Sequence, residues 1–271
     1  MSFGDLLRVT PGSRPDLAAI DPAGTPGFDG DKDAARDRLK ELRDELAGFQ
    51  ERLWAEAQHS LLIVLQALDA GGKDGLIRKV VTAFNPQGTR VAAFGVPTEE
   101  ERRHDYLWRI HAATPGKGRI GVFNRSHYED VLVVRVNELV AESVWSERYD
   151  QINAFEAHLA ANATRIVKFY LHISRDEQRR RFQKRLDNPE KHWKWDSGDL
   201  ETREKWQDFQ AAYTDALERC STDAAPWFVI PADHKWYRDL AAAEILAETA
   251  RSMDPHWPEP EEDVSGIVIP E

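Results

Sequence analysis

The segment LQALDAGGKDG, from Leu65 to Gly75, brings together three glycines, two aspartates and one lysine directly after a short apolar run. Glycines let the backbone turn sharply and approach an anion without a Cβ clash. A helix beginning near Lys73 would aim its free N–H groups and its positive dipole end at the same point. The lysine would add a positive charge for phosphate oxygens. These residues in this order predict a phosphate-binding loop between a strand and a helix.

The loop departs from the common pattern G-x-x-x-x-G-K-[ST] at two positions. Ala67 stands at the first glycine, and Asp74 stands where a serine or threonine would give Mg²⁺ a hydroxyl. Asp69 and Asp74 offer carboxylates instead, which are good ligands for a hard cation. A plain glycine-rich turn is the alternative interpretation, but the order strand, glycines, lysine favours function. The predicted phosphate contacts of the loop are Ala70, Gly71, Gly72, Asp74 and Gly75.

A second polar group, NRSHYED, follows an apolar segment at 119–124. In a parallel sheet, ligands bind at the carboxyl ends of the strands. Arg125 suits a bidentate phosphate contact, while Glu129 and Asp130 could hold a metal ion. The two acids could instead only cap the first turn of a helix. Combined with the first loop, we favour a binding site, with further contacts from Asn124, Ser126, His127 and Tyr128.

Six of the eleven residues from Arg175 to Arg185 are basic. Arg181 and Arg185 are four residues apart and therefore share one face of a helix. A solvated basic helix is the ordinary explanation of such a run. Because this one follows a predicted strand, where a mobile lid over a phosphate site would lie, we expect two or three of the six to contact ligand.

Short apolar or β-branched segments predict five strands, at 61–68, 89–95, 119–124, 165–173 and 226–231. The four intervals between them hold helical patterns, and this alternation predicts an α/β protein with a parallel sheet and helices on both faces. An amphipathic helix from Asp31 to about His59 precedes the first strand.

Two capping-box patterns predict where further helices begin. Thr98 with Glu101 precedes a predicted helix that carries Tyr106 to Ile110, and Ser174 with Glu177 follows the 165–173 strand.

We expect residues 1–271 to form a single domain, because the sequence shows no internal repeat and no low-complexity linker. Residues 1–30 are rich in glycine, proline and aspartate and predict an irregular arm. Residues 174–200 form the expected lid. Residues 254–271 form a proline-rich, acidic tail that ends in Ile267-Val268-Ile269, either a docking strand or a loose end.

The composition restricts the class of partner. A formal net charge of -11 argues against a broad surface for nucleic acid or anionic membrane, so a polyanion would need a local basic pocket. The only cysteine is Cys220, which excludes an intrachain disulfide and fits a reducing compartment. No apolar run approaches 18 residues. We expect a cytoplasmic protein without nucleic-acid or membrane partners.

Together these stretches resemble the family-2 polyphosphate kinases. The similar blocks span roughly residues 35–250 in the family's order: ALDAGGKDG, TEEERRHDYLWR, GRIGVFNRSHYEDVLVVRV, SRDEQRRRF, HWKWDSGDLETREKW and APWFVIPADHKWYRDLAAAEIL. The resemblance implies a P-loop kinase fold similar to that of thymidylate kinases, with a five-stranded parallel sheet and a helical lid. It also implies phosphoryl transfer between inorganic polyphosphate and nucleotides with Mg²⁺.

Residue by residue, the resemblance implies that Asp69 is the loop carboxylate that organises metal and phosphates. Lys73 would be the loop lysine and Arg125 the arginine of the second motif, so these three are the predicted catalytic residues. Arg181 and Arg185 would be lid arginines.

The family's second motif often begins with aspartate, where this chain has Asn124, so metal binding there would pass to Glu129 or Asp130 beside Asp69. The spelling FNRSHYEDVL resembles the subgroup that accepts both AMP and ADP. The implied partners are inorganic polyphosphate, AMP, ADP and ATP, and a homo-oligomer is expected.

Two other functions stay open at this point. A nucleoside-monophosphate kinase that uses ATP as donor would share the fold and the lid, but would need a second nucleotide pocket in place of a basic groove. A non-catalytic nucleotide-binding protein would bind ADP and turn over nothing.

Overall fold

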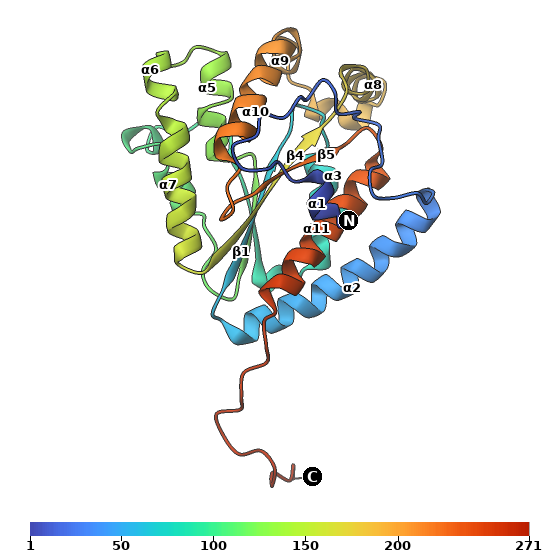
Figure 1. Ribbon diagram of the computed structural model, residues 1–271, viewed down its shortest axis with the longest axis vertical. Coiled ribbons are helices and arrows are strands. Elements are labelled where there is room, and N and C mark those ends of the chain that lie inside the picture. Colours follow the sequence, from blue (N-terminus) through green and yellow to red (C-terminus); the bar gives the residue numbers. More distant parts are fainter. Residues whose placement is uncertain (271) are drawn as a thin grey trace.

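The computed structural model describes residues 1–270, and five strands in it form one sheet (Figure 1). The strands are β1 (Ser60–Gln66), β2 (Thr89–Ala93), β3 (Ile120–Asn124), β4 (Thr164–His172) and β5 (Trp227–Pro231). Their order is β2-β3-β1-β4-β5, and every pairing between them is parallel. The five predicted strands and the parallel sheet are therefore confirmed.

Helices cover both faces of the sheet. Figure 1 shows α2 and α11 on one face and α7 and α10 on the other. Within residues 1–270, no helix is both long enough and apolar enough to cross a membrane. The α-helices are α1 (Phe3–Leu7), α2 (Lys32–Glu56), α3 (Lys73–Lys79), α4 (Trp108–His111), α5 (Val133–Val136), α6 (Glu142–Trp145), α7 (Arg148–Ala161), α8 (Arg175–Leu186), α9 (Gly198–Glu204), α10 (Trp206–Cys220) and α11 (Lys235–Met253). Short 3₁₀ helices are η1 (Val81–Ala83), η2 (Pro86–Gly88), η3 (Glu101–Arg103), η4 (His127–Asp130) and η5 (Pro189–Lys194).

The central strand β1 divides the hydrophobic core in two. All seven of its residues are buried. Leu61, Ile63 and Leu65 belong to the cluster that includes α2 and α11. Leu62 and Val64 belong to the cluster that includes α7 and α10. Because successive side chains in a strand point to opposite faces, a continuous apolar run is what a strand covered on both sides requires.

The helix starts agree only in part with the capping patterns. Asp31 caps α2 by accepting from the Asp33 and Ala34 amides at 3.0 and 2.9 Å. Thr98 and Glu101 do form a reciprocal capping box, but η3 is all that follows directly. The longer helix predicted there is wrong, because the chain turns again at His104 before the single turn of α4.

The start of α8 uses a different partner from the one predicted. The Ser174 hydroxyl accepts from the Glu177 amide at 3.0 Å, as a capping box requires. The Ser174 amide, however, donates to Asp233 at 2.8 Å, while the Glu177 carboxylate pairs with Arg181. Half of the predicted capping box is therefore replaced by a contact from the end of β5.

The N-terminal arm packs on the body, and it is not wholly irregular, contrary to the prediction. It contains α1, which begins with a capping box between Ser2 and Asp5. Beyond α1, the Val9 amide donates to the Trp227 carbonyl at 2.9 Å, and Arg8 forms an antiparallel bridge with Phe228. These contacts cover the outer edge of β5, which would otherwise be open to pairing.

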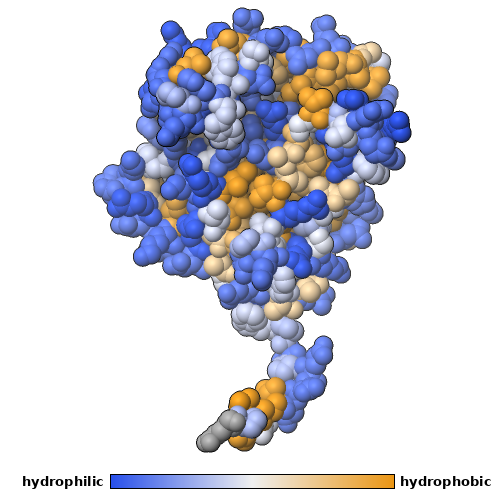
Figure 2. Space-filling view, turned by 180° about the vertical axis from the view of Figure 1, so that it is seen from behind, coloured by the Kyte–Doolittle hydropathy of each residue, from blue (hydrophilic) through white to orange (hydrophobic). Residues whose placement is uncertain are grey.

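The tail leaves the body after α11 and forms neither helix nor strand as far as Pro270 (Figure 1); Glu271 lies outside the described residues. Its apolar end is exposed, and Figure 2 shows it standing clear of the body. Residues 256–270 are all exposed, so this part of the tail has no docking position on the rest of the described chain.

Cys220 provides a direct test of the packing around α10. It has no exposed surface, and burial raises the pKa of its thiol to about 12. Because the thiolate is the reactive form, we expect iodoacetamide at pH 8 to leave the native protein unmodified. Unfolding in guanidinium chloride should expose this single thiol and allow rapid labelling, which mass spectrometry detects as the mass of one added label. Rapid labelling of the native protein would contradict the packing of α10 against the sheet.

Candidate active site

The predicted phosphate loop lies at the carboxyl edge of the sheet, between the end of β1 and the start of α3. A Cβ atom at Gly71 would approach the Leu68 carbonyl oxygen to 2.8 Å, and Gly72 has φ +110°. Only glycine fits these two positions without strain. Ala70 also has a positive φ, +60°, which a residue with a side chain adopts only when the surroundings hold it there.

Lys73 folds back over the loop that precedes it. Its ammonium group donates to the Ala67 carbonyl at 2.6 Å. Burial lowers its pKa, while the neighbouring Asp69 and Glu129 carboxylates oppose that effect and Arg125 adds to it. These neighbours place the lysine within one group with residues from both sequence motifs.

Asp69 and Arg125 form an ion pair of 2.8 Å across the site. The Arg125 backbone has a left-handed φ of +62°, and its amide donates to the Leu65 carbonyl at 3.0 Å. Although burial lowers its pKa, Glu129 and Asp69 outweigh burial, so the net pKa of Arg125 is raised. The structure therefore brings together all three residues predicted as catalytic, Asp69, Lys73 and Arg125.

Glu129 and Asp130 point to different parts of the protein. Burial raises the pKa of Glu129, and the opposing cations are Arg125 and Lys73, so Glu129 faces the loop. Asp130 forms an ion pair of 2.9 Å with Arg148. Burial raises its pKa as well, opposed first by Arg148. The predicted metal role of Asp130 therefore has no geometric support, because its carboxylate is committed to the start of α7.

No group of three or more His, Cys, Asp or Glu side chains in residues 1–270 is arranged to hold a metal ion. A cation at this site would therefore need ligands beyond the protein's own carboxylates.

Ser126, His127 and Tyr128 were expected to contact phosphate or nucleotide, but each has no exposed surface. The Ser126 hydroxyl accepts from the Gln66 side chain at 3.1 Å. The His127 ring and the Tyr128 hydroxyl both meet Glu156, at 3.1 and 3.0 Å. The expectation is corrected for these three residues, because the turn at η4 points them into the core.

Asp74 connects three parts of the site rather than standing free for a metal. It accepts from the Asn124 side chain at 3.0 Å and lies 3.5 Å from the Lys194 ammonium of the lid. Burial raises its pKa, but Asn124 and Lys194 outweigh that effect and lower it. Asp74 thus joins the loop to the end of β3 and to the lid.

Arg181 lies beneath the loop, and all five of its N–H groups are used. It donates to Glu177 at 2.7 Å, to the Ala70 and Gly71 carbonyls at 2.9 and 3.1 Å, and to the Ala232 and Asp233 carbonyls at 2.6 and 3.2 Å. Burial lowers its pKa to about 10, with Arg238 adding to the effect. The predicted ligand contact is corrected: Arg181 ties the loop to the end of β5.

Arg185 remains in the lid and forms an ion pair of 2.9 Å with Asp199 of α9. Burial raises the pKa of Asp199 to about 6, and the next contribution comes from Asp69. An acid of the lid therefore lies close to the acid of the loop. This proximity could not be predicted from the sequence, since the two residues are far apart in the chain.

Sequence reasoning missed three further residues that lie at the site or behind it. The Gln178 side chain donates to the Asp69 carbonyl at 3.0 Å. Arg238 lies behind the loop, where its guanidinium fills the space beside Gly72, and it pairs with Asp239 at 2.5 Å. Lys168 is fully buried in β4. A lysine inside an apolar strand, and an Arg-Asp pair in a mostly apolar helix, are signals that could have been recognised.

Comparison with known proteins places this geometry in context. A family model described as Polyphosphate kinase 2 (PPK2) matches residues 29–258. An AMP/ADP-polyphosphate phosphotransferase of Meiothermus ruber is 53% identical over 262 residues, which are 97% of this chain and 98% of the relative. An ADP-polyphosphate phosphotransferase of Rhodopseudomonas palustris is 42% identical over 265 residues, 93% of this chain and 91% of the relative.

Among solved structures, the chain is similar to the crystal structure of Polyphosphate Kinase 2 from Arthrobacter aurescens TC1. The TM-score is 0.94 at 43% sequence identity, and the match covers 97% of this chain and 94% of the other.

The position of Arg181 predicts a stability role. Arg181→Lys keeps the charge but replaces the five-donor fork with three donors on one atom. We expect the free energy of unfolding to fall by about 2–3 kcal/mol, because at least two hydrogen bonds of about 1–1.5 kcal/mol each are lost. Urea unfolding followed by circular dichroism measures this change.

The matched control is Arg180→Lys, since Arg180 also pairs with Glu177 but its side chain is 64% exposed. We expect this variant to stay within about 0.5 kcal/mol of the wild type. Equal stability of the two variants would contradict the structural role of Arg181.

Proposed function

The chain belongs to the polyphosphate kinase 2 family, and we propose that it transfers phosphoryl groups between inorganic polyphosphate and nucleotides, with both AMP and ADP as acceptors. Its parallel sheet and flanking helices form the P-loop kinase fold. The observation that carries the proposal is the meeting of Asp69, Lys73 and Arg125 at the carboxyl edge of the sheet. Acceptance of both nucleotides is supported by the 53% identity to an AMP/ADP-polyphosphate phosphotransferase.

The chemistry follows from the charges of the two substrates. The acceptor atom is a phosphate oxygen of AMP or ADP, which is already ionised at neutral pH, so the reaction needs no dedicated general base. The barrier comes mainly from bringing two polyanions together and aligning them, which fixed positive charge and positioning lower. In our proposal, Lys73 and Arg125 supply that charge, and the glycine loop brings backbone N–H groups to the phosphates.

We propose that Mg²⁺ is the cofactor and that Asp69 and Glu129 hold it. The raised pKa of Glu129 supports this assignment, because a buried carboxylate gains when a cation comes close. Mg²⁺ in phosphoryl-transfer sites is commonly bound by one or two carboxylates together with substrate phosphates, so an all-protein cluster is not required. When bound, the ion neutralises charge on the transferring group.

The lid, residues 174–200, supplies the remaining proposed contacts. Arg185 is its candidate for the polyphosphate chain, because Arg181 is already engaged by backbone carbonyls. Closure of such a segment over the site would exclude water, which would otherwise compete with the nucleotide as acceptor. The lid contact between Lys194 and Asp74 supports a closed arrangement over the loop.

The experiment that tests the function is a transfer assay with purified protein, Mg²⁺, polyphosphate and either AMP or ADP. We expect ADP to form from AMP and ATP to form from ADP, both measured by chromatography. A parallel reaction with ATP and AMP but without polyphosphate examines the nucleoside-monophosphate kinase alternative. Transfer from ATP to AMP, with none from polyphosphate, would establish that alternative instead.

Lys73→Met tests the loop assignment. Methionine keeps the length and packing of the side chain but removes the charge, so we expect the fold to remain and transfer to be abolished. Thermal unfolding and circular dichroism confirm the fold, and the polyphosphate assay measures activity. A folded variant that keeps most of the wild-type rate would show that the lysine does not contact the phosphates.

Asp69→Asn tests the metal assignment, since it keeps size and shape but removes a full negative charge. We expect the rate to fall about a hundredfold or more, about 3 kcal/mol, and the Mg²⁺ midpoint to rise. Asn124→Ala is the contrast, because Asn124 is already neutral and donates to Asp74. A Mg²⁺ titration in which the midpoint moves for Asn124→Ala but not for Asp69→Asn would overturn this division of roles.

A further inference from the structure

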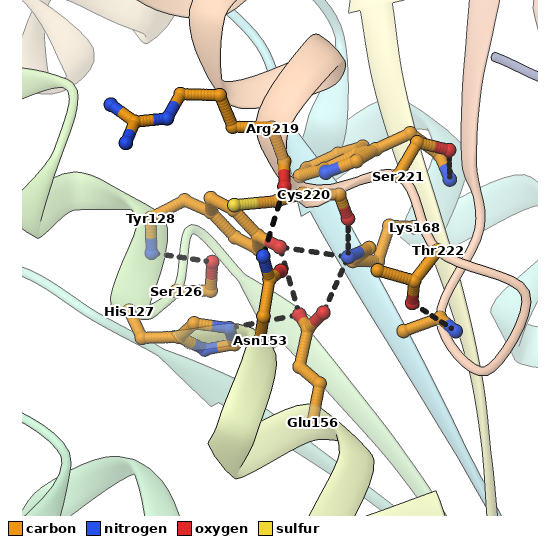
Figure 3. A network of polar contacts seen from close by, with 12 residues as sticks. Ser126, His127, Tyr128, Asn153, Glu156, Lys168, Arg219, Cys220, Ser221 and Thr222 are labelled. Carbon is orange, nitrogen blue, oxygen red and sulfur yellow. Dashed lines mark hydrogen bonds and ion pairs between the residues drawn. The ribbon is translucent and has the colours of Figure 1, made fainter. Parts of the chain in front are cut away.

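A buried polar cluster lies directly behind η4 (Figure 3). At its centre is Lys168 of β4, which has no exposed surface. Its ammonium group donates to Glu156 at 2.5 Å, to the Tyr128 hydroxyl at 2.7 Å and to the Cys220 carbonyl at 2.7 Å. All three N–H groups of the lysine are therefore satisfied, although the residue lies inside the core.

Glu156 of α7 completes the cluster. One carboxylate oxygen meets Lys168, and the other receives the Tyr128 hydroxyl at 3.0 Å and the His127 ring at 3.1 Å. Burial raises the pKa of Glu156, but Lys168 and His127 outweigh it, so the net pKa is lowered. Glu156 therefore stays ionised and holds two consecutive residues of η4 at once.

Stability alone is a poor explanation for this cluster. Desolvation of two buried charges costs about as much as their attraction returns, and apolar replacements of similar volume are often neutral or stabilising. Buried ion pairs can instead select one conformation among several of similar energy. The cluster has the features for that role, because every hydrogen of the lysine has a specific partner.

The conformation that the cluster selects is that of η4. His127 and Tyr128 stand between Arg125 and Glu129, the two residues of this segment that face the loop. The left-handed backbone of Arg125 is strained, so it persists only where neighbouring contacts fix it. A shift of this turn would move the Arg125 guanidinium and the Glu129 carboxylate together.

We propose that Lys168, Glu156 and Tyr128 are positioning residues, which hold η4 so that Arg125 and Glu129 meet the phosphates in register. They contact no substrate and act through the turn. The proposal deepens the proposed function and rests on it for its kinetic readout.

The test begins with Tyr128→Phe. This change removes the hydroxyl between Lys168 and Glu156 but keeps the ring that packs edge-on against Trp227 at 4.7 Å. We expect kcat for polyphosphate-dependent transfer to fall about tenfold or more, since a displacement of about 1 Å can cost about a hundredfold. KM for nucleotide and polyphosphate should change less than about twofold, because Lys73 and the lid remain in place.

The matched control is Tyr149→Phe. Tyr149 lies on the same helix as Glu156, is equally buried, and its hydroxyl accepts from Arg135 at 3.1 Å. The Tyr149→Phe variant loses one part-buried hydroxyl contact, to a partner outside η4. We expect its kcat to match the wild type, and an equal loss in both variants would overturn the positioning role.

A second comparison separates positioning from filling of the core. The double variant Lys168→Met with Glu156→Leu removes both charges at once, so we expect it to be more stable to urea than Lys168→Met alone. Its kcat should nevertheless stay low. Wild-type kcat in the stable double variant would show that the pair only occupies volume.

Hydrogen exchange measured by mass spectrometry reports on the turn without any substrate. We expect Tyr128→Phe to accelerate exchange of the 125–131 amides, and Tyr149→Phe to leave them unchanged. Unchanged exchange in Tyr128→Phe would defeat the positioning proposal even if activity fell. A wild-type protein without polyphosphate transfer would instead defeat the proposed function, while the exchange result would still decide the positioning of η4.

Discussion

Two cations, Lys73 and Arg125, and two carboxylates, Asp69 and Glu129, share one half-buried space at the carboxyl edge of the sheet. The site depends on the way these opposite charges offset one another's cost of burial. Burial lowers the pKa of Lys73 and raises that of Glu129, so each charge alone would be costly. Together with Asp69 and Arg125, each charge offsets part of the other's cost. In a protein of net charge -11, we propose that Lys73 and Arg125 supply the local positive charge that an approaching polyanion needs.

Compensation of this kind requires fixed positions, and the backbone of the site is held in conformations that it would not adopt freely. Ala70 and Arg125 both have left-handed φ angles, one in each motif. Arg181 fixes the first by donating to the loop carbonyls from below. The buried pair of Lys168 and Glu156 lies behind the second. The buried side chains of Arg181 and Lys168 thus hold the backbone, while those of Lys73 and Arg125 face the space where we place the phosphates.

Some cations hold the backbone of the site and others face the space for the phosphates. This difference shows which parts of the site could be predicted from the sequence. Strand positions followed from apolar runs, and the loop followed from the order of glycines and Lys73, because both signals are local. The roles of Arg181 and Arg185 could not be separated, since both lie on one helical face. Their difference depends on where the end of β5 brings its carbonyls. The inward direction of His127 depends likewise on α7, which is distant in sequence.

The acid that replaces the usual loop hydroxyl has a role that the sequence did not indicate. Asp74 was expected to offer oxygen to a metal, yet it accepts from Asn124 and pairs with Lys194 of the lid. The Asp74 side chain is 71% exposed, so this ion pair contributes only a fraction of a kcal/mol and can break without opening the fold. A weak contact suits a lid that must admit a long polyanion and release a nucleotide. In our proposal the metal role then falls to Asp69 and Glu129, because both are half-buried and a cation is more valuable there than at exposed Asp74.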